Sequence, residues 1–181
     1  HSLFLRTCVE VEANCKAILT ENGYNKATDM NMRDYKKINI THRLSSYKVK
    51  IPNCRGNNNI RQPFIEWSTG NGLSWYQAYN TTKHDRHNEF EKAMFKHLLD
   101  AVCGLLIVLS SQFETYDFSP GNMLLAVSGP NDNDDMESGI GNYFRVEFPN
   151  DWPVDDKYEF NWQTLKNEVE PFQNINYNNI A

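Results

Sequence analysis

Hydrophobic residues recur at helical spacing through the first 20 positions of the chain. The repeat follows one face of an amphipathic helix, and neighbouring apolar residues widen that face. The face consists of Phe4, Cys8, Val11, Cys15 and Ile18, widened by Leu5, Val9 and Leu19. The pattern predicts a helix over 3–20, which Gly23 then ends. A second, shorter helix is expected over 30–38.

The longest apolar stripe lies in the middle of the chain. Ser74 with Gln77 resembles a capping box, so a helix is expected to begin there. An unbroken helix over 74–112 would be about 58 Å long, which exceeds a compact domain of this size. We therefore expect a break near 82–88 and a central helix over about 86–112. Its buried face should consist of Phe90, Met94, Ala101, Leu105 and Val108.

The second half of the chain changes from helical to strand-like patterns. Strands are expected over 123–127 and 143–148, and an earlier one over 47–51 that Pro52 ends. The acidic, Gly/Asn-rich stretch 129–141 should be a mobile loop. A short helix is expected over 162–169 and a polar tail over 173–181.

Together these elements predict an α+β fold. It should be mainly an α-helical bundle with a small antiparallel sheet from the C-terminal half. The 181 residues should form a single domain, 1–181, because that length suits one sizeable core. The helical core should cover about 3–113, and a strand-containing extension should cover about 120–170.

Composition narrows the classes of protein. A hydrophobic content of 40% and an aromatic content of 13% are typical of globular chains. No apolar run approaches the roughly 18 residues of a membrane span, so we expect no membrane partner and a cytoplasmic location. The four cysteines lack the spacing of metal ligands and should be buried free thiols, as is usual in a reducing compartment.

The charge is distributed unevenly. Residues 1–96 carry 15 Lys/Arg and 9 Asp/Glu, a balance of +6, whereas residues 97–181 carry 3 and 14, a balance of −11, which gives the net charge of −5. A basic half can face phosphates. It can equally pair with the acidic half, in the same molecule or across a dimer.

Candidate chemistry is concentrated in residues 79–86, where five kinds of polar group fall within about two helical turns. Asn80 and His84 are four apart and share a helix face. His84 is a candidate general acid–base, because an unperturbed imidazole titrates near neutrality. Lys83 and Arg86 are candidate phosphate or oxyanion contacts. The alternative is a polar helix end that anchors a turn.

Two further groups are candidates. His84, His87 and Glu91 have the spacing of a zinc or iron site, but no second cluster of strong ligands accompanies them, so we expect neither a metal nor a cofactor. Glu12 and Lys16 lie one turn apart on the first helix. They either form a surface ion pair, or Glu12 is partly buried and faces the site.

The stretch Tyr79-Asn80-Thr81-Thr82-Lys83-His84 resembles the signature of the HEPN proteins (higher eukaryotes and prokaryotes nucleotide-binding), which is Arg, a polar residue, a few more residues and His. Asn80 and His84 match, and Tyr79 stands where the Arg belongs. Glu12 and Lys16 are similar to an acidic–basic pair on an early helix of some members. The resemblance covers roughly 3–20 and 67–113.

The resemblance implies a helical bundle that cleaves RNA without a metal, often as a dimer. His84, Arg86 and Asn80 would be catalytic, Lys83 and Arg86 would bind phosphate, and Tyr79, Glu12 and Lys16 would support them. Arg86 lies seven residues after Tyr79 and is placed to supply the missing cation.

Two functions are therefore carried forward. The first is an RNA-binding or RNA-cleaving protein of a bacterial defence or toxin type. The second is a non-catalytic dimerisation or scaffold module. A homodimer would meet near Tyr79 and Arg86, with the neighbouring aromatics as anchors, since aromatic residues and Arg are enriched in interfaces. Core packing is the alternative role of those aromatics, which are Trp67, Trp75, Tyr76 and Tyr79.

Overall fold

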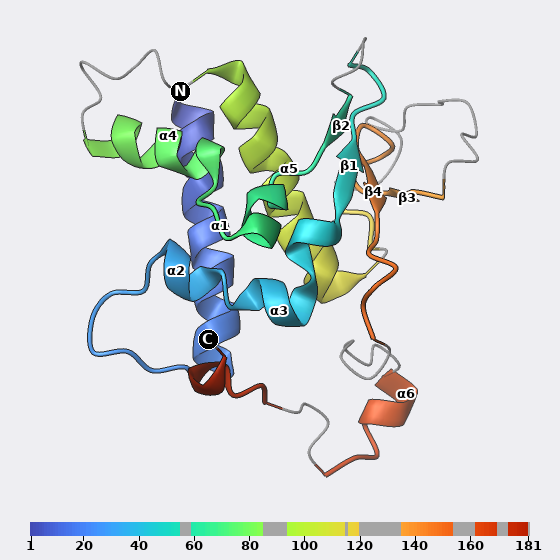
Figure 1. Ribbon diagram of the computed structural model, residues 1–181. Coiled ribbons are helices and arrows are strands. Elements are labelled where there is room, and N and C mark those ends of the chain that lie inside the picture. Colours follow the sequence, from blue (N-terminus) through green and yellow to red (C-terminus); the bar gives the residue numbers. More distant parts are fainter. Residues whose placement is uncertain are drawn as a thin grey trace.

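Helix α1 (Ser2–Glu21) is the axis of the helical part of this computed structural model (Figure 1). The structure describes residues 1–54, 59–84, 94–114, 116–119, 135–153, 162–169 and 174–180. The predicted face of α1 is buried, together with Leu19, whereas Val9 is exposed. Gly23 follows the helix with φ +72°, a left-handed conformation that favours glycine at the end of a helix.

Helix α5 (Phe95–Phe113) packs along α1, and helix α4 (Ser74–His84) contacts both. A break before α5 (Phe95–Phe113) is shown by the extended backbone of its N-cap, Met94, whereas most of the range expected for the break, 82–88, lies outside the described part of the chain. Residues 85–93, with Phe90, lie outside the described part of the chain.

The buried face of α5 agrees only in part with the prediction. Ala101 and Val108 are buried and Leu105 is half-buried, but Met94 is 51% exposed. The prediction for Met94 is wrong because this residue is the N-cap, with extended backbone, and so does not continue the helical face. Helix α5 also begins later than expected.

A carboxylate from the preceding 3₁₀ helix caps the start of α4. Ser74 is the first helical residue, and its backbone N–H donates to Oε2 of Glu66 in η2 (Ile65–Thr69) at 2.7 Å. The predicted capping box is wrong, because the Ser74 side chain makes no cap hydrogen bond within the described part of the chain. A negative group suits this position because the helix dipole is positive there.

Four short strands form one antiparallel sheet in the order β2-β1-β4-β3 (Figure 1). They are β1 (Lys48–Lys50), β2 (Ile60–Arg61), β3 (Glu137–Ser138) and β4 (Arg145–Glu147). The strands expected within 47–51 and 143–148 are confirmed, and 123–127 lies outside the described residues. The α+β fold is thus confirmed at this level.

The sheet is not built from the C-terminal half alone, which corrects the prediction. Strand β1 pairs with β2 on one edge and with β4 on the other, with Val49 opposite Val146. Lys48 Nζ and Glu147 Oε1 form a cross-strand ion pair at 2.8 Å. Because β3 is only two residues long, β4 obtains its longer pairing from the first half of the chain.

The stretch expected as a mobile loop contains β3. Asp117 holds the following turn, since the backbone N–H of Gly141 donates to its Oδ1 at 3.0 Å and Ser138 Oγ donates to its Oδ2 at 2.8 Å. The loop prediction is therefore wrong for 137–138, and residues 129–134 lie outside the described part of the chain.

Short helices complete the fold. The expected helix over 30–38 is two shorter ones, α2 (Met32–Tyr35), capped by Asn31, and α3 (Ile38–His42). The helix expected over 162–169 is α6 (Trp162–Leu165). Two further 3₁₀ helices in the described part of the chain are η1 (Leu44–Ser46) and η5 (Tyr177–Asn179). The prediction of a polar tail is wrong at Tyr177, which is fully buried.

Helix α5 is long and apolar enough, by length and composition, to cross a membrane. More than half of its most apolar stretch is buried inside the molecule, and a core helix of a soluble protein passes the same test.

Candidate functional site

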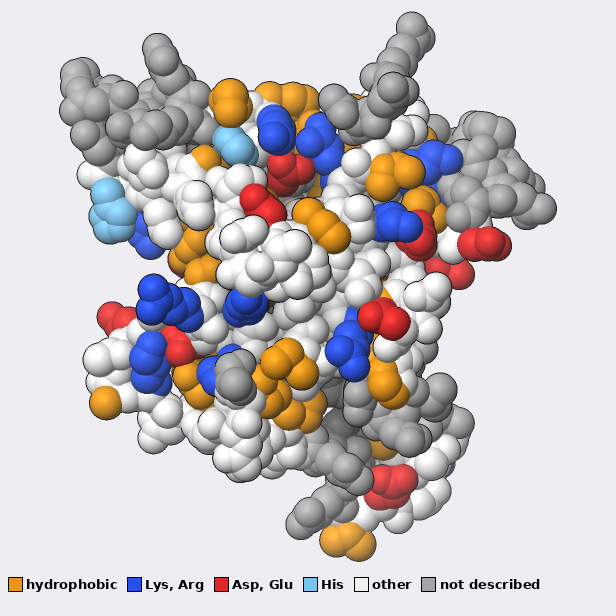
Figure 2. Space-filling model, in the orientation of Figure 1, with side chains coloured by type: hydrophobic (Ala, Val, Ile, Leu, Met, Phe, Trp, Pro, Cys, Tyr) orange, Lys and Arg blue, Asp and Glu red, His pale blue; other side chains and the backbone are white. Residues whose placement is uncertain are grey.

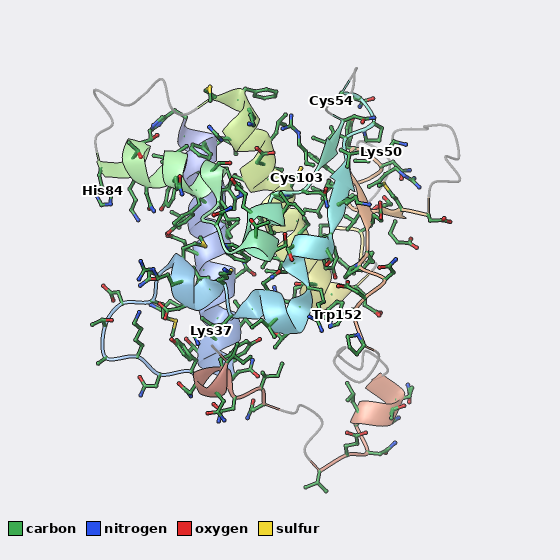
Figure 3. The ribbon with its side chains drawn as sticks, viewed as in Figure 1. Lys37, Lys50, Cys54, His84, Cys103 and Trp152 are labelled. Carbon is green, nitrogen blue, oxygen red and sulfur yellow. The ribbon has the colours of Figure 1, made fainter. Side chains whose placement is uncertain are left out.

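The part of the polar motif that lies on helix α4, residues 79–84, has side chains on different faces of the helix. Tyr79 points inward and is 1% exposed, Asn80 is half-buried, and Lys83 and His84 are exposed. Figure 3 shows His84 at the outer end of α4, away from the sheet. No described residue bonds to its imidazole. Arg86, predicted to act with it, lies outside the described residues.

The carboxylate of Glu12 on α1 contacts two tyrosines of α4. Tyr76 OH donates to Glu12 Oε1, and Tyr79 OH donates to Glu12 Oε2 at 3.3 Å. Glu12 is half-buried, between Cys8 and Cys15 on the buried face of α1. The interpretation that Glu12 faces the motif is therefore confirmed. A carboxylate in such a place needs donors, because burying it without them is costly.

The two phenols act as hydrogen-bond donors at neutral pH. Burial, and then the bond to the Glu12 carboxylate, raise the pKa of Tyr76 well above its usual value. Burial is also the main cause that raises the pKa of Tyr79. Tyr79 is consequently neither a cation nor a base. It occupies the motif position of Arg and binds a carboxylate there.

Lys83 completes this cluster on the solvent side. Its Nζ lies 5.1 Å from the centroid of the Tyr79 ring, a cation–π geometry. The hydrogen bond to the Tyr79 phenol raises the pKa of Lys83, and the charge of Glu12 contributes in the same direction. The ammonium group therefore stays charged at neutral pH while its outer surface remains exposed.

The surface is indented between α4 and α2, and Lys and Arg side chains gather on both sides of the indentation (Figure 2). Helix α2 carries the exposed Arg33, and Lys36 is its C-cap. Lys36 Nζ lies 4.0 Å from where a Cβ on Gly70 would be, in the turn that leads to α4. We call the indentation between these helices the α4–α2 notch, and its candidate cations are Lys83 of α4, Arg33 of α2 and Lys36 at the C-cap of α2.

Sequence reasoning missed three participants. Tyr76 lies three residues before Tyr79, and this spacing on one helix face was a usable signal for a shared partner. Arg33 and Lys36 are some 50 positions from the motif, and no local pattern links them to it. Lys16, by contrast, is exposed and forms no ion pair with Glu12.

The thiols near Glu12 are unreactive. Burial, with a smaller contribution from Glu12, raises the pKa of Cys15 to about 12, and the same causes raise the pKa of Cys8. All four cysteines are free, and Cys54 is the one that is only half-buried. The prediction of free thiols is confirmed.

The described residues contain no group of three His, Cys, Asp or Glu side chains that could hold a metal ion. Of the alternative metal set, His87 and Glu91 lie outside the described part of the chain. Of the three residues of that set, only His84 belongs to the described part of the chain.

The aromatic residues near the motif pack in the core, as the alternative interpretation held. Each is at least nine-tenths buried, and Trp75 donates from Nε1 to the Pro63 carbonyl at 2.8 Å. Phe64 stacks between two of them, with ring centroids 4.8 Å from Trp67 and 6.1 Å from Trp75. They are not free to anchor a dimer, so the predicted homodimer needs other contacts.

No family model matches the chain, and neither a curated protein nor a solved structure matches it. The resemblance to HEPN proteins therefore rests on the sequence features alone, which are the motif, the Glu12 and Lys16 pair and the patterns over 3–20 and 67–113.

Proposed function

We propose that this protein binds RNA along the α4–α2 notch. The observation that carries the proposal is the indented surface between α4 and α2 with Lys and Arg side chains along it, together with the exposed, charged Lys83 that is held against Tyr79. Phosphate groups are the natural ligands of such an arrangement, because several cations on separate elements can follow a backbone of repeated negative charges.

The distribution of charge supports this choice. The first 96 residues carry a balance of +6 in a chain whose net charge is −5. A polyanion would be repelled by the chain as a whole, but at a Debye length of about 8 Å it responds mainly to the charges close to it. The notch lies entirely within the basic half.

The motif in residues 79–86 also suggests that the protein cleaves the RNA that it binds. In an RNA-cleaving protein of the HEPN type, His84 would transfer the proton, Lys83 and Arg86 would contact the scissile phosphate, and Asn80 would orient His84. Tyr79 weakens this extension, because its phenol donates to Glu12 and offers no cationic fork to a phosphate. Binding is therefore the primary proposal and cleavage the secondary one.

Binding is tested by fluorescence polarisation with a labelled single-stranded RNA at low salt. Lys83→Glu and Arg33→Glu should each weaken binding about tenfold or more, since each replaces an attraction with a repulsion. Lys166→Glu is the matched control, because Lys166 is an exposed lysine outside the notch, just beyond α6. Equal effects of all three changes would show that RNA responds only to net charge.

Cleavage is tested with the same RNA and with structured RNA, with and without EDTA. If His84 transfers the proton, His84→Ala should slow cleavage by about two to four orders of magnitude and leave binding intact. Cleavage that survives this change would exclude the role of His84. Cleavage lost to EDTA would favour the set of His84, His87 and Glu91.

A second function is favoured by the contacts of Glu12. Two buried tyrosines and a carboxylate that bond to one another are a means of fixing α1 against α4. A structural role of this kind for the polar motif is compatible with a non-catalytic scaffold module. Absence of RNA binding, combined with a dimer by sedimentation at micromolar concentration, would support this function over the first.

A further inference from the structure

Residues 174–180 lie against the C-terminal end of α1, far from α6 (Figure 1). Three hydrogen bonds spread along the segment attach it to the helical part of the molecule. Ile175 N–H donates to Asn22 Oδ1 at 2.7 Å, Tyr177 OH and Thr41 Oγ1 lie 2.8 Å apart, and Lys37 Nζ donates to the Ile180 carbonyl. Figure 3 shows Lys37 next to η5.

The segment alternates between buried and exposed side chains. Tyr177 is fully buried, and Ile175 and Ile180 are partly buried against the core. The asparagines between them are exposed, and Asn176 caps η5 by accepting from the N–H of Asn178. This alternation is typical of a peptide bound to a receptor, in which a few side chains are buried and backbone groups form hydrogen bonds with the receptor.

The receptor surface lies far from the segment in sequence. Asn22, Lys37 and Thr41 are separated from their partners by 153, 143 and 136 positions. The nearest described residues before the segment, 162–169, are mostly exposed, and Val169 is 99% exposed. The described contacts of the segment therefore do not depend on which chain delivers it.

We propose that the surface of Asn22, Lys37 and Thr41 is a peptide-binding site that accepts residues 174–180 from a second copy of this chain as well as from its own. The same hydrogen bonds and the same burial of Tyr177 form in both cases. The intramolecular arrangement is favoured by effective concentration, because the segment and the surface belong to the same chain. Weakening the segment in one copy opens its surface to the segment of another.

The direct test uses the full chain with Tyr177→Ala, whose surface is left open, and a fluorescein-labelled peptide of residues 174–181. The peptide should bind this variant at least tenfold more tightly than the wild type, where the resident segment competes. A peptide with Tyr177→Ala should not bind. Adding Thr41→Val to the protein should weaken binding about tenfold, because the hydrogen bond between the tyrosine hydroxyl and Thr41 is lost.

Exchange between copies is tested by complementation. One variant, Tyr177→Ala, offers an open surface, and the other, Asn22→Ala with Thr41→Val, offers a released segment. Sedimentation of the mixture should show a 1:1 complex that neither variant forms alone. Circular dichroism first establishes that each variant is folded, and Tyr177→Phe replaces Tyr177→Ala if the latter unfolds. No peptide binding up to millimolar concentration, or no complex in the mixture, would overturn the proposal.

Discussion

At the scale of single residues, some polar side chains are buried in this protein and form hydrogen bonds there. Glu12 is the clearest case, because a carboxylate on the buried face of α1 accepts hydrogen bonds from Tyr76 and Tyr79. His42 is a second case. It is almost fully buried, and its Nδ1 lies 2.8 Å from Thr41 Oγ1. Hydrogen bonding at Glu12 and the burial of the imidazole at His42 therefore both bear on stability.

The two tyrosines should contribute unequally to stability. The 3.3 Å bond of Tyr79 is long for a hydroxyl donor, whereas Tyr76 makes the closer contact with Glu12. Hydrogen bonds to charged groups contribute about 1.5–3 kcal/mol, so Tyr76→Phe should lower the free energy of unfolding by about 2 kcal/mol. Tyr79→Phe should cost about half as much. Urea denaturation measures both, and in a Glu12→Gln background the two costs should shrink.

His42 should make the protein less stable in mild acid. Burial lowers the pKa of His42 to about 4, from 6.5 for a free histidine. Between these values the unfolded chain takes up a proton that the folded chain does not, so acid favours unfolding. The free energy of unfolding should fall from pH 6.5 to pH 4 by on the order of 3 kcal/mol, and this contribution should level off below.

The control for this effect is another histidine. His42→Gln should flatten most of the pH dependence measured by urea denaturation in this range. Burial also lowers the pKa of His97, so part of the slope should remain. His84→Gln changes an exposed side chain and should leave the slope as in the wild type. A slope that persists in full after His42→Gln would show that burial of this residue does not set it.

At the scale of elements, helix α5 packs closely against its neighbours at two glycines. One is Gly104 in the helix itself, and the other is Gly139, which faces Leu106 of the helix. A Cβ on Gly104 would lie 3.4 Å from Trp75 and 3.5 Å from Phe64, which is ordinary contact. A Cβ on Gly139, beside β3, would lie 3.0 Å from Leu106 and 3.3 Å from Val146, which is tighter than most real contacts, so a neighbour must shift slightly. The two positions therefore differ in how much space surrounds them.

Alanine should have opposite effects at these two glycines. Gly104→Ala should raise the free energy of unfolding by about 0.5–1 kcal/mol, because alanine favours helix and its methyl group fills contact distance. Gly139→Ala should lower it by about 1–3 kcal/mol, because Leu106 must shift to make room. Thermal unfolding of both variants decides the matter. Destabilisation by Gly104→Ala would mean that α4 cannot tolerate the added methyl.

The sheet and the helices are joined by one largely buried ion pair. Arg61 of β2 contacts Asp100 of α5, with 3.2 Å between the guanidinium and the carboxylate. Burial raises the pKa of Asp100, and the charge of Arg61 opposes this rise. The pair therefore depends on both partners being present.

Removing Arg61 should leave a buried carboxylate without its cation. Arg61→Met should lower the free energy of unfolding at pH 7 by about 3 kcal/mol. The loss should be smaller near pH 4, since the raised pKa of Asp100 favours its protonated form in the folded protein. The double variant with Asp100→Leu should recover part of the stability. A double variant less stable than Arg61→Met would contradict this explanation, and denaturation at both pH values measures it.

At the scale of the whole molecule, the sequence predicted what is local and missed what is long-range. Helix α1 and the strand around Val49 followed from periodicity, and a break before α5 followed from the length of an unbroken helix. The pairing of β1 with β4 joins positions about 100 residues apart and has no local signature. The cap of α4 by Glu66 and the burial of Tyr177 were missed for the same reason, because each depends on a partner outside the local pattern.

In the candidate site, too, local features could be predicted from the sequence and long-range features could not. The position of Glu12 opposite the motif could be predicted, because a charged residue on an apolar helix face must find donors. The role of Tyr79 as one of those donors could not, since the motif gave it the place of an Arg. The cations of α2 could not be assigned to the notch from the sequence, because the position of α2 depends on how the chain folds between α1 and α3.

The salt dependence of RNA binding tests the notch most directly. The logarithm of the association constant should fall linearly with the logarithm of NaCl concentration, with a slope of about −0.7 per phosphate contact for a single strand. Lys83→Met should make the slope less steep by about 0.7, and Lys166→Met should leave it unchanged. An unchanged slope after Lys83→Met, or no binding by the wild type at low salt, would contradict the proposal that RNA lies along α4 and α2.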